Sequence, residues 1–209
     1  MKKYLFALAA LAVAFSATPV QAQGFTPYAD MPAGVYTLDK HHASLIWKVS
    51  HAGLSYYAGR FKSFDATINF DPSDVTKSTV AATIYPASLE TDYVPTPEED
   101  FNKKISTSAE WLNADKFPEM TFTSTKVERT GEFTAKVHGN LTFLGVTKPV
   151  VLDATYNGAY IEQPFSKKPT IGFSATGSLN RSDWGLKTYI PAIGDKVDLY
   201  IEGEFVKND

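Results

Sequence analysis

The chain contains no cysteine among its 209 residues, which excludes disulfide bonds, thiol catalysis and lipid attachment to a cysteine of this sequence. It also lacks a large charge of either sign, because 20 lysine and arginine residues stand against 23 aspartate and glutamate residues. Such a balance does not predict the basic surface of a nucleic-acid-binding protein or the polybasic patch of a protein that binds a membrane surface. No apolar run reaches the roughly 18 residues that a transmembrane helix requires.

Motifs for the common enzyme chemistries are missing as well. There is no Gly-x-Ser-x-Gly element, and the four histidines (His41, His42, His51 and His138) have no spacing typical of a zinc or facial-triad site. The acidic run from 98 to 100 fits the first turn of a helix, where the dipole favours negative charge. We therefore expect neither catalytic residues nor a metal site.

Residues 1–22 have the organisation of a secretory signal peptide. Lys2 and Lys3 precede an apolar segment from Tyr4 to Phe15, and a small-x-small cleavage site ends at Ala22. We expect cleavage after Ala22 and export to a bacterial periplasm. The mature chain, residues 23–209, would be one domain with 18 basic and 23 acidic residues, a net charge of −5.

Alternating apolar and polar residues dominate the mature chain, most clearly around residues 138–152. Leu141 and Phe143 alternate with polar neighbours, the period of a half-buried strand, and Leu144-Gly145 offers a tight reversal into a second strand. Further strands of this kind, separated by turn residues, precede and follow this segment. The pattern predicts an all-β, antiparallel barrel or sandwich.

Residues 95–113 interrupt the β pattern. Thr96-Pro-Glu-Glu99 has the form of a capping box, and Thr107-Ser-Ala-Glu110 repeats it before Trp111. The sequence therefore predicts one or two short helices inserted between strands. Such an insertion would act as a lid or as a plug for one end of a barrel.

Two arginines admit two interpretations. Arg181 and Asp183 would share a face of an extended segment, where they could form a structural ion pair. A guanidinium at a barrel rim could equally bind an anionic headgroup, and Arg60 presents the same choice. Aromatic residues spread over nearly every strand, so a barrel of this composition could enclose an apolar cavity.

Several segments, taken together and in order, resemble the YceI-like family of periplasmic polyisoprenoid-binding proteins. The most specific is Gly139-Asn-Leu-Thr-Phe-Leu-Gly-Val-Thr-Lys-Pro149. The others are Tyr36-Thr-Leu-Asp39, Val49-Ser-His-Ala-Gly53, Gly59-Arg-Phe-Lys-Ser-Phe64, Phe117-Pro-Glu-Met-Thr-Phe-Thr-Ser124 and Asn180-Arg-Ser-Asp-Trp-Gly185. The resemblance covers essentially the whole mature chain.

This resemblance implies an antiparallel, lipocalin-like β-barrel of about eight strands with a short helical insertion and a long apolar pocket. Its ligand would be a non-covalently bound polyisoprenoid lipid, either a polyprenyl phosphate or a quinone-like molecule. The expected pocket residues are Trp47, Val49, Phe61, Ile84, Trp111, Phe122, Leu141, Phe143, Phe173 and Leu199. Polar candidates for the mouth are Arg60, Arg181, Lys104 and His51.

The implied role is binding, transport or storage of the lipid in the periplasm. The alternative is a redox or envelope-stress accessory protein that presents a quinone-like ligand to a membrane partner. Either role allows transient membrane contact, and exposed sheet edges would allow a homodimer.

Overall fold

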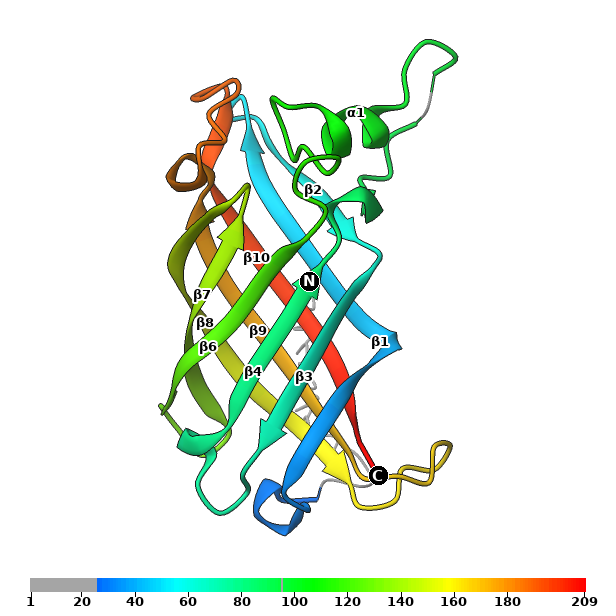
Figure 1. Ribbon diagram of the computed structural model, residues 1–209, viewed down its shortest axis with the longest axis vertical. Coiled ribbons are helices and arrows are strands. Elements are labelled where there is room, and N and C mark those ends of the chain that lie inside the picture. Colours follow the sequence, from blue (N-terminus) through cyan, green and yellow to red (C-terminus); the bar gives the residue numbers. More distant parts are fainter. Residues whose placement is uncertain (1–25, 95) are drawn as a thin grey trace, which may run out of the picture.

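The computed structural model describes residues 26–94 and 96–209, and the predicted signal peptide lies outside them. Strands make up most of the described chain (Figure 1). They are β1 (Gly34–His51), β2 (Ser55–Phe61), β3 (Phe64–Phe70), β4 (Thr79–Ile84), β5 (Leu89–Glu90), β6 (Met120–Arg129), β7 (Thr134–Phe143), β8 (Val146–Tyr160), β9 (Thr170–Asn180) and β10 (Ile193–Lys207). The helical elements are α1 (Phe101–Thr107) and the 3-10 turns η1 (Tyr28–Asp30), η2 (Val75–Lys77), η3 (Pro86–Ser88) and η4 (Arg181–Trp184).

Eight of the strands form a closed antiparallel barrel. The sheet runs β10-β9-β8-β7-β6-β4-β3-β1, and β10 pairs in turn with β1. The predicted lipocalin-like barrel of eight strands is thereby confirmed, and the alternative of a sandwich is excluded. Closure leaves the two-residue β5, which pairs with β2, as the terminal strand of the sheet. The homodimer expected from exposed sheet edges stays a prediction.

The long strand β1 changes partner halfway along its length. Its first residues, Gly34–Thr37, pair with β3, whereas 46–51 pair with β2. Between them its register with β10 shifts from Leu38 to Ala43. Intervening residues bulge outward, and there Nδ1 of His42 lies 2.8 Å from Oδ2 of Asp39. The bulge bends β1, as Figure 1 shows on the right of the barrel.

The hairpin predicted at 144–145 is confirmed. Phe143 pairs with Val146, and the two residues between them have positive φ, 49° at Leu144 and 75° at Gly145. Two positive φ values characterise the type I′ turn, whose twist matches that of the flanking strands. A Cβ at Gly145 would lie 2.8 Å from Phe117 Cε1, so the ring of Phe117 packs against the turn.

The helical insertion differs in detail from the prediction. Helix α1 begins after Asp100, whose carboxylate accepts a hydrogen bond from Lys103 N at 2.9 Å, and Thr96 is not its cap. The first helical residue, Phe101, also makes a tertiary contact, since its ring stacks on that of Tyr93 with the centroids 4.6 Å apart. The acidic run therefore precedes the helix instead of forming its first turn.

The second capping signature forms turns and no helix. Ser108 ends α1, and its carbonyl accepts hydrogen bonds from both Trp111 N and Asn113 N. The chain then folds back over the helix, where Leu112 N bonds to the Ile105 carbonyl. Across the described residues no helix has the length and hydropathy needed to cross a membrane.

Candidate ligand-binding site

A cavity of about 240 Å³ occupies the barrel interior. Its wall extends from mid-barrel residues such as Ile84, Leu141 and Leu199 to Val75 in η2 and Phe133 in the β6–β7 connection. Figure 1 shows η2 and that connection at the end of the barrel opposite α1. The cavity therefore runs from the middle of the barrel toward this second end, which we call the distal end.

Small side chains on the inner wall create the space. Ala135 pairs with Ala154, which pairs with Ala175, and these three residues on β7, β8 and β9 all line the cavity. Ala66 and Ala82 form a similar pair across β3 and β4. A barrel of eight strands is just wide enough for large side chains to fill, so alanine at these inward positions leaves room for a ligand.

Aromatic rings line the rest of the wall. Phe133, Tyr156, Phe173 and Phe205 form a chain of ring contacts with centroid separations of 6.3, 5.6 and 6.2 Å. Phe122 contributes a further ring from β6. Nearly all the cavity surface is thus aliphatic or aromatic, which suits an apolar ligand.

The α1 end of the barrel is filled by packed side chains. Trp184 in η4 is only 4% exposed, and its Nε1 donates a hydrogen bond to the Leu141 carbonyl at 3.2 Å. Leu186, Ile105 and Leu112 are buried in the same core cluster. Ile105 and Leu112 belong to the helical insertion, which therefore contributes to the packing at this end, and its role as a plug or a lid stays a prediction.

Polar side chains meet the cavity at the distal end. Arg129, Glu132, Ser78 and Thr134 are among its lining residues, and the first two are exposed. Tyr28 in η1 packs edge-on against Phe133 and Tyr156, with ring centroids 6.5 and 5.9 Å away. This polar margin is the candidate mouth of the cavity.

Comparison with known families shows the family to which this chain belongs. Residues 36–205 match the model of the YceI-like domain. The protein belongs to the YceI-like family. Its relatives include UPF0312 proteins of Pseudomonas putida strain GB-1 and Pseudomonas fluorescens strain SBW25. Each is 40% identical over 177 residues, which cover 84% of this chain and 88% of the relative.

Solved structures share the YceI-like barrel. A Campylobacter jejuni YceI protein is 32% identical, with a TM-score of 0.65 over 77% of this chain and 90% of that one. BcnA of Burkholderia cenocepacia is 22% identical, with a TM-score of 0.67 over 80% and 98% of the two chains. A polyisoprenoid-binding domain from Saccharophagus degradans is 15% identical, with a TM-score of 0.62 over 83% and 98%. At their low identity, the last two show the fold alone.

The ten apolar residues predicted for the pocket of this YceI-like protein divide into two groups. Five line the cavity: Ile84, Phe122, Leu141, Phe173 and Leu199. Five lie outside it: Trp47, Val49, Phe61, Trp111 and Phe143. Among the residues outside the cavity, Phe143 packs near Trp184, with ring centroids 6.4 Å apart. The ring centroids of Trp111 and Tyr189 are 6.0 Å apart. The ring of Trp47 packs over Gly59.

Arg181 is a structural residue, and the expected ion pair with Asp183 does not form. The side chain is 3% exposed, because it is enclosed by the β9–β10 connection. Its guanidinium donates four hydrogen bonds of 2.8 to 3.1 Å to the carbonyls of Gly194, Leu186, Thr188 and Ile193. Burial lowers the pKa of Arg181, and the charge of Asp195 opposes that shift. Four of its five donors are thus occupied by protein, which leaves little capacity for a headgroup.

The other polar candidates also lie away from the cavity. Arg60 is exposed and its Nη2 lies 3.1 Å from Oδ2 of Asp92. Lys104 pairs with Glu99 at 2.5 Å, and His51 is exposed at the end of β1. The structure therefore does not bring the predicted mouth residues together at the cavity.

Sequence reasoning missed the alanines and Arg129. The alanines occupy inward positions in strands whose alternation was evident, for example Ala66 between Phe64 and Ile68. Arg129 is the last residue of β6 and stands two residues after Val127, so both side chains point to the same face of the strand. Small or charged residues at inward positions are the signal that could have located both the cavity and its mouth.

Proposed function

We propose that this protein binds the apolar chain of an isoprenoid lipid, without covalent attachment and without catalysis, inside the barrel cavity. The observation that most directly supports this proposal is the continuous apolar wall of the cavity, with charged side chains gathered at its distal end. A pocket of this kind selects a long apolar chain through burial, because each buried CH2 contributes about 0.8 kcal/mol. The bound lipid would be carried or stored as a soluble complex in the periplasm.

The size of the cavity bears on how the chain would lie. At about 240 Å³ it is smaller than the roughly 300–1,000 Å³ of pockets that enclose drug-sized ligands. A polyprenyl chain would therefore displace aromatic rings such as Phe122 or Phe133, or project from the mouth. Rings on a curved wall can change rotamer without loss of the strand ladder, so the wall can adapt.

Two similarities and one sequence pattern support the proposal. A domain with the same fold, from Saccharophagus degradans, is described as polyisoprenoid-binding. Family membership and the signal-peptide pattern of residues 1–22 support export to the periplasm. The lipid itself is proposed as a polyprenyl phosphate or a quinone-like molecule, in line with the family resemblance.

The test is native mass spectrometry of the protein purified from the periplasm, followed by organic extraction and identification of the lipid. One bound isoprenoid per chain is the expected result. A ligand with quinone absorbance would favour the alternative role as a redox accessory. An empty protein that also fails to take up added polyprenyl lipids would overturn the proposal.

A further inference from the structure

The three arginines of the chain have very different surroundings. Arg181 is enclosed by carbonyls, and Arg60 pairs with Asp92 on the outside of the barrel. Arg129 lines the cavity at its distal end, and no carboxylate of the described residues forms an ion pair with it. We propose that Arg129 binds an anionic headgroup, a phosphate or carboxylate, of a lipid whose chain fills the cavity. The inference rests on the proposed function for the chain and adds the headgroup class and the direction of insertion.

Strand register directs Arg129 inward. Arg129 pairs with Ala135, and Val127 pairs with Val137, two residues earlier on the same face of β6. Ala135, Val127 and Val137 all line the cavity. Since paired residues point to the same side of a sheet, Arg129 is the last inward-facing residue of β6, where the apolar wall gives way to solvent.

The guanidinium is positioned by two contacts that leave its terminal nitrogens available. Its Nε donates to the Gly131 carbonyl at 2.9 Å, and its Cζ lies 5.7 Å from the centroid of the Tyr28 ring. No described hydrogen bond uses Nη1 or Nη2. Those two nitrogens form the edge that binds carboxylate or phosphate in a bidentate manner.

Glu132 limits the strength of this site. It lies exposed on the same margin of the cavity and forms no ion pair with the described lysines, arginines or histidines. Its negative charge opposes a bound anion without neutralising Arg129 through direct contact. Removing that charge should therefore strengthen anion binding.

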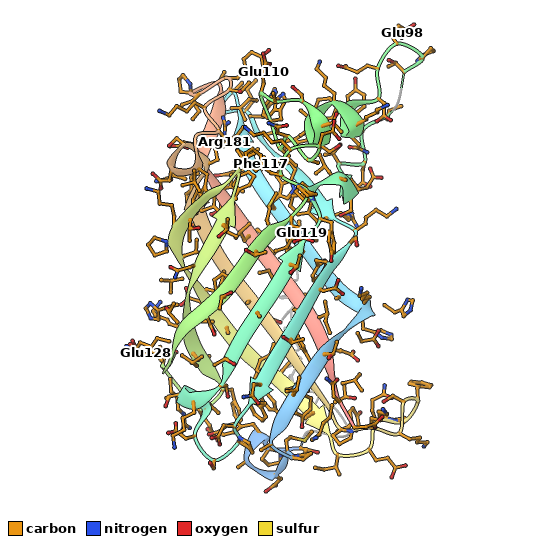
Figure 2. The ribbon with its side chains drawn as sticks, in the orientation of Figure 1. Glu98, Glu110, Phe117, Glu119, Glu128 and Arg181 are labelled. Atoms are coloured by element: carbon orange, nitrogen blue, oxygen red, sulfur yellow. The ribbon has the colours of Figure 1, made fainter. Side chains whose placement is uncertain are left out.

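Packing at the opposite end of the barrel disfavours the reverse orientation. There the buried Trp184 closes the interior, and Arg181 has four of its donors occupied. Figure 2 shows Arg181 at this closed end, whereas Glu128, the neighbour of Arg129, lies at the far end of β6. A lipid would enter chain first from the distal end and leave its headgroup beside Arg129.

The experiment compares farnesyl phosphate with farnesol, two probes with the same chain that differ in the headgroup. Binding to the mature chain is measured by isothermal titration calorimetry. Arg129→Gln should weaken farnesyl phosphate binding about tenfold or more and leave farnesol binding unchanged. Arg129→Lys should retain part of the preference, and Glu132→Gln should raise the affinity for the phosphate about two- to fivefold. Arg60→Gln, which removes an arginine outside the cavity, is the matched control and should change neither affinity.

Other outcomes would overturn the assignment. Equal losses for both probes in Arg129→Gln would show that Arg129 only supports Tyr28 and the cavity wall. No loss for either probe would place the headgroup elsewhere. Wild-type protein that binds farnesol without preference for the phosphate would overturn this inference alone, whereas a protein that binds neither probe would overturn the proposed function with it.

Discussion

The ring of Phe122 on β6 packs directly over Gly139 on β7. A Cβ at position 139 would come within 2.3 Å of Phe122 Cζ and 2.7 Å of the Thr123 carbonyl oxygen, distances that no Cβ tolerates. The glycine thus lets an aromatic ring lie flat against the inner wall at the level of the cavity. The ring of Phe122 is thereby held at the cavity wall, which it lines.

Gly139→Ala should therefore destabilise the protein. Overpacking of this kind costs about 1–3 kcal/mol, because Phe122 has to leave its rotamer or the strands have to move apart. The free energy of unfolding from urea denaturation measures the effect. Gly172→Ala is the control, because its nearest contact would be 3.7 Å, and it should leave stability unchanged or slightly raised. Equal stability of the two variants would contradict the close packing.

Ala154→Leu should block ligand uptake while the barrel stays folded. Ala154 faces the cavity between Ala135 and Ala175, so the larger side chain of leucine occupies space that we assign to the lipid chain. We expect at least a tenfold loss of farnesol affinity with an unchanged circular dichroism spectrum. Thr155→Leu adds a side chain at the neighbouring exposed position and should bind as the wild type does. Full uptake by Ala154→Leu would show that the chain does not pass this point.

Arg181→Met should destabilise the protein by more than about 3 kcal/mol. The substitution leaves four carbonyl groups in a largely buried site without their charged donor, and each such loss costs about 1–3 kcal/mol. Urea denaturation again gives the measurement, with Arg60→Met as the surface control, expected within about 1 kcal/mol of the wild type. Wild-type stability of Arg181→Met, combined with altered lipid binding, would instead return Arg181 to a ligand role.

Stability should fall at alkaline pH because of two buried tyrosines. Burial raises the pKa of Tyr36 to about 12, and burial raises that of Tyr156 as well. Both hydroxyls are donors in the folded state, to the carbonyls of Pro32 at 2.7 Å and Thr26 at 2.6 Å. A group with a raised folded-state pKa contributes its full stabilisation below the unfolded pKa, about 10 for tyrosine, and loses it as the pH rises through the folded value.

The unfolding free energy should accordingly be flat from pH 8 to about 9.5 and decline between about pH 10 and 12. Urea titrations across this range measure it. The double substitution Tyr36→Phe/Tyr156→Phe, although less stable at neutral pH, should show a shallower decline because neither ring can ionise. An equally steep decline in the double variant would assign the alkaline transition to other groups.

Local patterns in the sequence were enough to predict the barrel. Alternation in segments such as 64–70 and the Leu144-Gly145 reversal determine strands and hairpins, and both depend on neighbouring residues only. The resemblance to the YceI-like family supplied the strand number and the lipocalin-like shape, which closure of β10 onto β1 confirms.

Which end of the barrel is open could not be predicted in the same way. The alternation of apolar and polar residues predicts that Leu141 and Phe143 lie on the same face of their strand, yet only Leu141 lines the cavity. Phe143 lies at the end filled by Trp184, which comes from a connection about forty residues later in the chain. The position of a residue along the barrel axis depends on such distant segments, and for the same reason Arg181 was a headgroup candidate while Arg129 was overlooked.

The pairing of the first strand with the last has a topological consequence. Tyr36 pairs with Lys207, and Asn208 N donates to the Val35 carbonyl at 2.9 Å, so the two ends of the barrel chain lie side by side. A short linker could join these two ends, and new ends could be made in the exposed connection between β8 and β9. All strand pairings of the barrel would then be preserved. Circular permutants of this kind would keep the cavity intact, because the barrel is defined by its cycle of strand pairs and has no structural need for a particular starting strand.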